Sequence, residues 1–216
     1  PIFTVVTGPA VSGPALLIGL SDIVIMTSDA YAFVTGPTMV AEFTGVVISN
    51  NELGGSDIHA KQSGVAHLVV ADRETAFAEV EHVLSFLPDN VNEIAAAVAT
   101  SDSVDRLTPE AGALIPENPT GAYDVKAVIR SIADDGYLLE LRERWAPNIV
   151  TGLITIGAQS VGVVANQPMN LAGTLDIPAS QKAARFVAFC DAFNIPILTL
   201  VDTPGFYPGK DLEWRG

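Results

Sequence analysis

The sequence predicts an α/β fold built as two tandem parts. Apolar runs of strand length alternate with segments of helical periodicity, and glycine-rich turns separate them. The composition, 49% hydrophobic and 17% charged residues, is typical of a packed globular protein. With 216 residues the chain is long enough to bury a sizeable core, either in one large domain or in two small ones.

The first part opens as a strand, a glycine-rich loop, a short helix and a second strand. The opening strand takes residues 1–6, the loop residues 7–13 and the second strand residues 23–27. Pro14 occupies the first helical position, where its missing N–H group is tolerated. Residues 30–36 read as a further strand.

The first part closes with a strand and an amphipathic helix. The strand ends near Val70, and Asp72 is placed to cap a helix that reaches about residue 87. The apolar face of this helix is predicted to hold residues at helical spacing, namely Phe77, Val80, Val83, Leu84 and Leu87.

The second part follows a predicted linker. Periodicity fades over residues 91–118, where proline and acidic residues gather. We then expect a helix over residues 122–134, two strands around a turn over residues 148–168, and a helix with Ser180 as its N-cap. A strand ending at Asp202 follows. The expected organisation is therefore a domain over residues 1–90, a linker over 91–118, and a domain over 119–216.

Charge and composition exclude several classes of function. The chain has 11 basic and 25 acidic residues, a net charge of −14, which repels nucleic-acid phosphates. Cys190 is the one cysteine, so an internal disulfide is excluded, and we expect a buried thiol in a reducing compartment. The spacing of His59, His67 and His82 fits no metal site, and we expect no metal in this chain.

The N-terminal residues 2–20 carry no charge over about the length of a membrane span. Glycines and prolines interrupt them, so a soluble strand-loop-helix unit is expected rather than a membrane segment, and no signal or transit peptide is visible. The chain begins with Pro1 inside a strand-like run and stops after "DLEWRG". We therefore expect an excerpt of a longer protein that is inactive and aggregation-prone when expressed alone.

The stretch "VDTPG" at residues 201–205 matches a loop that contacts the γ-phosphate in GTPases. Nucleotide binding also needs a GxxxxGK[ST] loop upstream, and no segment before residue 200 matches it. The Gly209-Lys210 pair lies downstream and is followed by Asp211 rather than serine or threonine. The GTPase interpretation therefore fails.

The glycine-rich loops can instead present main-chain donors. A turn that enters a helix leaves backbone N–H groups unpaired, and the Ser12-Gly13 peptide precedes such a helix. These amides could stabilise an oxyanion, although a tight turn packed on a strand explains the same pattern. No GxSxG elbow is present, and Asp202 is expected to cap its own loop. An active site here would work mainly with backbone dipoles.

Five ordered segments resemble one family. Residues 1–27 are similar to the oxyanion-hole unit of the crotonase superfamily. "YAFVTGPTMV", "ELGGSDIHAKQSGVAH", "VGVVANQP" and "KAARFVAFCDAFNIPILTLVDTPGFYPG" resemble the carboxyltransferase (β) subunit of biotin-dependent acyl-CoA carboxylases, with propionyl-CoA and acetyl-CoA carboxylases most similar. The resemblance implies a crotonase-like ββα-superhelix in two tandem partial domains, the later part of the first and the early part of the second.

The resemblance also implies a carboxyl transfer from carboxybiotin to a short-chain acyl-CoA through an enolate held by backbone oxyanion holes. Ser12 and Gly13 match the helix-side donor pair of the first domain, where the family usually has two glycines. The strand-end loop of the second site includes Gly205 and Phe206, which would be catalytic.

Binding residues follow from the same resemblance. Asn166, Gln167 and Pro168 match a motif close to the biotin pocket, and Tyr207 would line the second site. The implied cofactor is biotin on a partner carrier domain, and the implied substrate is a coenzyme A thioester. The implied partners are a biotin carboxylase or biotin carboxyl carrier subunit and further copies of the chain, since the family forms hexamers.

Two alternatives remain open. One is a biotin-dependent decarboxylase subunit acting on glutaconyl-CoA or methylmalonyl-CoA, which runs the transfer in reverse. The other is a catalytically silent assembly subunit, which the unusual Ser12 favours slightly. A bacterial cytoplasm, or the mitochondrial matrix in a eukaryote, is the expected compartment.

Overall fold

The structure, a computed structural model, describes residues 1–118 and 121–215. It divides into two compact units, Pro1–Val83 and Leu84–Gly216, which are described separately below. The expected second domain begins at Pro119 and ends at Gly216, and both of these residues lie outside the described ones. The assignment of residues 1–90, 91–118 and 119–216 as domain, linker and domain stays a prediction.

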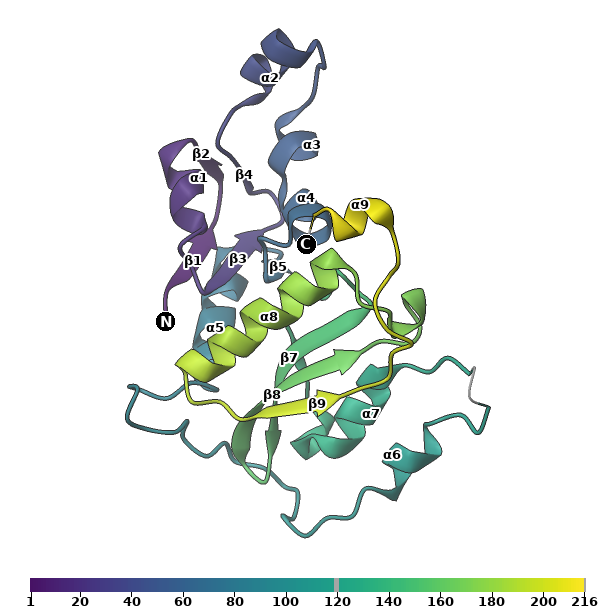
Figure 1. The fold of residues 1–216 in the computed structure, drawn as a ribbon. Coiled ribbons are helices and arrows are strands. Elements are labelled where there is room, and N and C mark those ends of the chain that lie inside the picture. Colours follow the sequence, from purple (N-terminus) through teal and green to yellow (C-terminus); the bar gives the residue numbers. More distant parts are fainter. Residues whose placement is uncertain (119–120, 216) are drawn as a thin grey trace. The chain divides into compact units, whose positions relative to one another are not determined.

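The first unit contains two small parallel sheets (Figure 1). One has the order β1 (Phe3–Val6), β3 (Ile23–Thr27), β5 (Leu68–Val70), and the other pairs β2 (Pro9–Val11) with β4 (Tyr31–Phe33). All five residues of β3 are buried, as expected for a parallel strand covered on both faces. Strand β2 forms inside the predicted glycine-rich loop, because its backbone pairs with β4.

Short helices complete the first unit. They are α1 (Gly13–Ile18), α2 (Pro37–Thr44), α3 (Asn50–Gly54), α4 (Ser56–Ile58), the π-helix η1 (His59–Ser63) and α5 (Arg73–Leu84). The predicted cap of α5 is confirmed, since the Asp72 carboxylate accepts the Thr75 N–H at 2.8 Å. Helix α5 ends three residues earlier than predicted. Phe77 is 48% exposed, because Ala76 and Val83 form the buried stripe.

The second unit is built on a mixed sheet of order β6 (Leu139–Glu140), β7 (Ile149–Ile156), β8 (Gln159–Asn166), β9 (Ile197–Leu200). The predicted strand pair around a turn is confirmed as the antiparallel hairpin β7–β8. Strands β8 and β9 are parallel and are joined through α8 (Ile177–Ala192), which lies across the sheet (Figure 1). Shorter helical elements are α6 (Pro109–Ala113), α7 (Val125–Ile132), η2 (Asp134–Gly136), η3 (Leu171–Gly173) and α9 (Lys210–Glu213).

A buried carboxylate holds the β7–β8 turn. Gly157 and Ala158 both have positive φ, 57° and 68°, as a two-residue hairpin turn requires. The Asp134 carboxylate accepts the N–H of Gly157 at 3.0 Å and that of Ala158 at 2.7 Å. The turn is therefore fixed by η2, which follows α7.

The predicted N-cap of α8 is wrong. The helix begins at Ile177 with Asp176 as its N-cap, and the Asp176 carboxylate accepts the Ala179 N–H at 3.0 Å. Pro178 suits the first turn because it lacks an N–H group. The Ser180 N–H is already bonded to the Asp176 carbonyl at 3.0 Å, so Ser180 lies inside the helix.

Residues 91–118 contain no strand and only the short α6, yet they are anchored within the second unit. The Arg106 guanidinium donates to the carbonyl oxygens of Ser131, Ile132 and Ala133 at 2.9 to 3.1 Å. These carbonyls end α7, where a cation is favoured by the helix dipole. None of the described helices is long and apolar enough to cross a bilayer.

The sheet of the second unit lies between two helices. Val163 and Ala165 of β8 pack with Val125 and Ile129 of α7. Gly162, which faces the other way, packs under α8, and a Cβ there would lie 2.5 Å from the Cys190 Sγ. The close approach of α8 therefore requires glycine at position 162.

Replacing Gly162 by alanine is expected to lower the free energy of unfolding by about 1–3 kcal/mol, the usual cost of overpacking. Thermal or denaturant unfolding of the complete natural protein measures it. Gly112→Ala is the matched control, because a Cβ at Gly112 meets nothing within 4 Å. Equal stability of the two variants would show that α8 does not pack as described.

Candidate active site

The first candidate bend is the Ser12-Gly13 peptide at the start of α1. The Ser12 N–H donates to the Phe33 carbonyl at 3.0 Å, which ties the bend to β4, and the Ser12 carbonyl accepts the Leu16 N–H at 3.2 Å. The Gly13 N–H is bonded to no described group. Of the two amides predicted as a donor pair, one therefore holds the bend and the other is available to a ligand.

The second candidate bend is formed by residues 203–207, which follow β9. The Gly205 N–H donates to the Thr203 Oγ1 at 3.1 Å, and the Gly205 carbonyl accepts the Leu175 N–H at 3.0 Å. The Tyr207 N–H donates to the Leu175 carbonyl at 2.8 Å. Phe206 lies between these two bonds in a parallel bridge, so its own N–H points away from Leu175.

The Phe206 N–H is bonded to no described group. Gly205 and Phe206 therefore share the arrangement of Ser12 and Gly13. At each bend the first of the two amides is used to build the bend, and the second is unbonded. The structure thus offers one main-chain donor at each bend.

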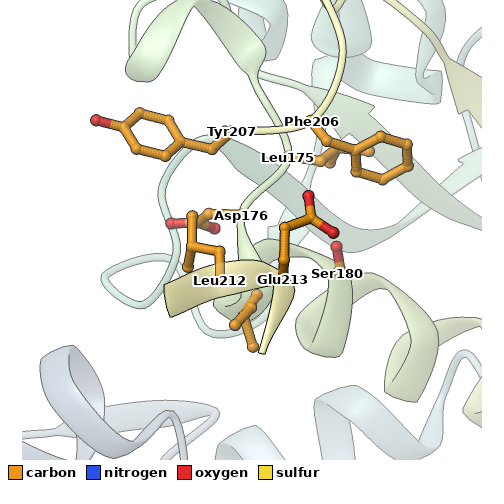
Figure 2. Close-up of a pocket in the computed structure, with 8 residues that line it drawn as sticks. Leu175, Asp176, Ser180, Phe206, Tyr207, Leu212 and Glu213 are labelled. Atoms are coloured by element: carbon orange, nitrogen blue, oxygen red, sulfur yellow. The ribbon is translucent and has the colours of Figure 1, made fainter. Parts of the chain in front are cut away.

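A cavity of about 340 Å³ lies beside the second bend. Its lining residues are Leu175, Asp176, Ile177, Ser180, Phe206, Tyr207, Leu212 and Glu213. Figure 2 shows the Glu213 carboxylate and the Ser180 hydroxyl pointing into the space below Phe206, while the Tyr207 hydroxyl points away from it. Two carboxylates and no basic side chain line this cavity, so it favours an uncharged group or a cation over an anion.

Asn166 and Gln167 lie apart from this cavity, and both are buried. The Asn166 amide donates to the Gly173 carbonyl at 2.9 Å, and its oxygen accepts the Asp202 N–H at 3.3 Å. The Gln167 amide donates to the Asp124 carboxylate at 2.7 Å. Both side chains fix neighbouring segments.

Pro168 lines a different cavity of about 450 Å³, together with Asp202, Thr203 and Pro204 among others. The eight predicted site residues therefore fall into distinct groups. Phe206 and Tyr207 line the cavity of Figure 2, Pro168 lines the second cavity, and the remaining ones shape the bends or the segments behind them.

Asp202 does not cap its own loop as predicted. Its carboxylate is hydrogen-bonded to the Tyr123 hydroxyl. Burial, this hydrogen bond and the negative charge of Asp202 together raise the pKa of Tyr123 to about 12. Tyr123 therefore stays protonated at neutral pH and acts as a hydrogen-bond donor that holds the strand end.

Two residues that support the site are absent from the predictions. The Asn148 amide donates to the Thr174 carbonyl at 2.8 Å and to the Asp176 carboxylate at 3.2 Å, which positions the wall of the Figure 2 cavity. Lys182 is fully buried, and its Nζ donates to the carbonyls of Trp145 at 2.9 Å and Ile149 at 2.8 Å.

The burial of Lys182 could have been predicted from its position in the sequence. Ala179, Lys182, Phe186 and Cys190 are the buried residues of α8 and recur at helical spacing, so Lys182 occupies a core position. Burial lowers the pKa of Lys182 to about 7, and the negative charge of Glu140 opposes this shift.

No conventional nucleophile or metal cluster appears among the described residues. Burial raises the pKa of Cys190 to about 12, so its thiol is not activated. The His67 Nδ1 accepts the Val24 N–H at 3.0 Å and the His59 Nε2 contacts the Ala32 carbonyl at 2.8 Å. The described part of the chain has no group of three or more His, Cys, Asp or Glu residues that could hold a metal ion.

These two bends, each with one free amide, lie in a chain that matches the carboxyl transferase domain family over residues 1–216. The chain belongs to this family. The predicted resemblance is thereby confirmed. The propionyl-CoA carboxylase beta chain of Roseobacter denitrificans is 44% identical over 217 residues, which cover 100% of this chain and 42% of that protein. The methylmalonyl-CoA decarboxylase subunit alpha of Veillonella parvula is 40% identical, with 100% of this chain and 43% of that protein covered.

Solved structures confirm the predicted crotonase-like α/β fold. The transcarboxylase 12S crystal structure, described as a hexamer assembly with hydrolysed methylmalonyl-coenzyme A bound, matches with a TM-score of 0.95 at 42% identity. The match covers 99% of this chain and 42% of the transcarboxylase chain. A single-chain, multi-domain long-chain acyl-CoA carboxylase matches with a TM-score of 0.81 at 32% identity, covering 100% of this chain and 21% of that one. The chain thus spans about two fifths of the curated relatives it matches.

Asn166→Ala is expected to lower the midpoint of thermal unfolding and to speed hydrogen exchange of residues 202–207. The change leaves the Gly173 carbonyl and the Asp202 N–H without their partner, a loss of about 1–3 kcal/mol. Asn170→Ala is the control, since the Asn170 side chain makes no capping bond. Exchange that is unaltered by Asn166→Ala would contradict a holding role for Asn166.

The free energy of unfolding is expected to rise between about pH 7 and pH 10 through Lys182. In this range the buried lysine loses its proton whereas the unfolded lysine keeps it, so the unfolded state binds more protons. Lys182→Met removes this contribution, and exposed Lys61→Met does not. Unfolding midpoints of the natural protein and the Lys182→Met variant that run parallel from pH 7 to pH 9 would contradict the assignment.

Proposed function

We propose that the complete protein containing this chain transfers a carboxyl group between carboxybiotin and a short-chain acyl-CoA, with propionyl-CoA or acetyl-CoA as acceptor. The observation that carries the proposal is a carboxyl transferase match over the whole chain, in which both glycine-bearing bends leave one amide unbonded. The propionyl-CoA carboxylase beta chains at 44% and 43% identity support this substrate class.

The proposed chemistry needs charge stabilisation more than side-chain acids and bases. Carboxybiotin, carried on a partner domain, would supply the carboxyl group and accept the α-proton of the acyl-CoA. A nitrogen–carbon bond breaks, and a carbon–carbon bond forms at the α-carbon of the thioester. Negative charge develops on the thioester oxygen and on the ureido oxygen, and main-chain N–H groups are suited to hold both charges.

We assign a different oxyanion to each bend. The Gly13 N–H, unbonded at the start of α1, would donate to one oxyanion. The Phe206 N–H would donate to the other, and Ser180 and Glu213, which point into the cavity of Figure 2, would position the ring that carries it. The acidic lining of this cavity disfavours the several phosphate charges of coenzyme A most strongly, so we assign the cavity to the ureido ring, where the Phe206 N–H would offset the charge that develops on the oxygen.

We further propose that the two bends serve different active sites of an oligomer. The first unit would be the later part of one carboxyltransferase domain, and the second unit the early part of the next. A relative, transcarboxylase 12S, is described as a hexamer assembly, which supports shared sites between copies. The proposed partners are a biotin carboxylase and a biotin carboxyl carrier subunit.

Decarboxylation is a second candidate. The decarboxylase subunit alpha of Veillonella parvula is 40% identical over the whole chain, close to the identity of the carboxylase relatives. The two reactions use the same bends in opposite directions. Release of carbon dioxide from methylmalonyl-CoA only when a biotin-carrying partner is added would favour decarboxylation.

The complete natural protein, mixed with a carboxylated biotin carrier, is expected to carboxylate propionyl-CoA or acetyl-CoA, as measured by mass spectrometry of the acyl-CoA. Phe206→Pro, which removes the N–H, is expected to lower kcat by about 100-fold or more. Phe206→Leu, which keeps the N–H and removes the ring, is the matched control and should retain most of the rate.

Three outcomes would contradict the proposal. Absence of transfer with all short and branched acyl-CoA acceptors would leave the silent assembly subunit as the better account. Release of carbon dioxide without net carboxylation would favour the decarboxylase. If the folded Phe206→Pro and Phe206→Leu proteins have the same kcat, the Phe206 N–H is not part of the proposed site.

A further inference from the structure

Lys182 is a fully buried charged side chain of α8. Its Nζ donates to three carbonyl oxygens, those of Trp145 at 2.9 Å, Ala146 at 3.4 Å and Ile149 at 2.8 Å. An ammonium group has three N–H donors and no acceptor, so each of its protons serves one carbonyl. The segment 145–149 is therefore held against α8 by a single amino group.

The segment that Lys182 holds carries Asn148, whose side chain reaches the wall of the cavity in Figure 2. The Asn148 amide donates to the Thr174 carbonyl at 2.8 Å and to the Asp176 carboxylate at 3.2 Å. Thr174 and Asp176 are the two neighbours of Leu175 in the chain, and both Leu175 and Asp176 line the cavity. Lys182 is thus connected to this wall through one buried side chain.

Leu175 continues this path to the second bend. Its N–H donates to the Gly205 carbonyl at 3.0 Å, and its carbonyl accepts the Tyr207 N–H at 2.8 Å. These two bonds flank Phe206, whose N–H is the proposed donor. The direction of the Phe206 N–H therefore depends on a path of hydrogen bonds and adjoining backbone that begins at Lys182.

The path also closes on itself through the cap of α8. The Asp176 carboxylate accepts from the Asn148 amide and from the Ala179 N–H at 3.0 Å, so it caps the helix that carries Lys182. A shift of the segment 145–149 therefore displaces the cavity wall and the start of α8 together. Buried polar networks of this kind hold one arrangement only while every member is satisfied.

The network needs the proton of Lys182, because a neutral amine has two N–H donors and can serve only two of the three carbonyls. Burial is the main cause that lowers the pKa of Lys182 to about 7. Glu140 of β6 and Glu143 oppose this shift, whereas Lys126 of α7 and Arg142 add to it. Strands β7 and β8, which also pack against α8, contain no titratable side chain.

We infer that Lys182 is a positioning residue of the second bend, which the ammonium form aligns and the neutral form leaves misaligned. This inference rests on the proposed function and adds that turnover depends on a buried proton far from the reacting atoms. Turnover should fall as the pH rises above 7, whereas the free energy of unfolding rises because a buried charge is removed. A merely structural role would make the two quantities change together.

The pH profile of kcat tests the inference in the complete natural protein with saturating acyl-CoA and carboxylated carrier. Lys182→Met cannot provide the three bonds at any pH, and Lys61→Met is the matched control, since Lys61 is exposed. At pH 6 the kcat of Lys182→Met is expected to be about tenfold below that of Lys61→Met, with a nearly equal KM for acyl-CoA. At pH 9 the two values should be about equal, because the control has lost its proton.

Two results of this comparison would overturn the inference. One is an equal kcat of the two folded variants at pH 6. The other is a ratio of their kcat values that stays constant from pH 6 to pH 9, which would mean that the Lys182 proton has no part in turnover.

Asn148→Ala tests the path itself, because it cuts the connection between Lys182 and the cavity wall. Alone it is expected to lower kcat at pH 6 about as much as Lys182→Met. The double variant should be no slower than the slower single variant, since both changes act on one path. Effects on kcat that multiply in the double variant would contradict action through Asn148.

Hydrogen exchange separates this inference from the proposed function and needs no substitution. In the complete natural protein without ligand, the protection factors of the Leu175 and Tyr207 amides are expected to fall about tenfold from pH 6 to pH 9. In Lys182→Met they should be low at both pH values. Protection that stays constant in the natural protein would overturn the inference. If protection falls as expected but no carboxyl group is transferred, the proposed function fails and the positioning of the bend by Lys182 stands.

Discussion

At each of the two bends, one main-chain N–H group holds the bend and its neighbour is left unbonded. Ser12 is tied to the Phe33 carbonyl and Gly205 to the Thr203 hydroxyl, which leaves Gly13 and Phe206 as donors. A donor fixed by its own neighbour needs no reorganisation when charge develops on a ligand. Further contacts hold the segments on either side of the second bend.

The support in the second unit comes from buried polar side chains that bond to loop backbone. Lys182 holds the segment that leads into β7, Asn148 holds Thr174 and Asp176, and Asn166 joins the segments around Gly173 and Asp202. Loops carry many backbone groups that strands and helices do not satisfy, so such side chains are the means of burying them. The segments around Phe206 are thus held by buried side chains of other segments.

Much of the fold could be predicted because local patterns decide it. The apolar run of β3 and the hairpin β7–β8 follow from periodicity and turn residues, and family motifs identified both bends. The predicted start of α8 is wrong because Asp176, Pro178 and Ser180 are all residues that suit a helix N-terminus. Only the hydrogen bond from the Ala179 N–H to the Asp176 carboxylate shows which one caps the helix. That the Ser12 amide is bonded, or that Lys182 is buried, depends on segments distant in sequence.

Hydrogen exchange at single amides tests the central claim most directly. In the complete natural protein without ligand, the amides of Ser12 and Gly205 should exchange slowly and those of Gly13 and Phe206 rapidly, because only the former are bonded. An acyl-CoA analogue with a nitronate in place of the thioester, which carries the charge of an enolate, should then slow exchange at Gly13. Slow exchange at Gly13 and Phe206 in the free protein would mean that neither amide is available, and it would contradict the account.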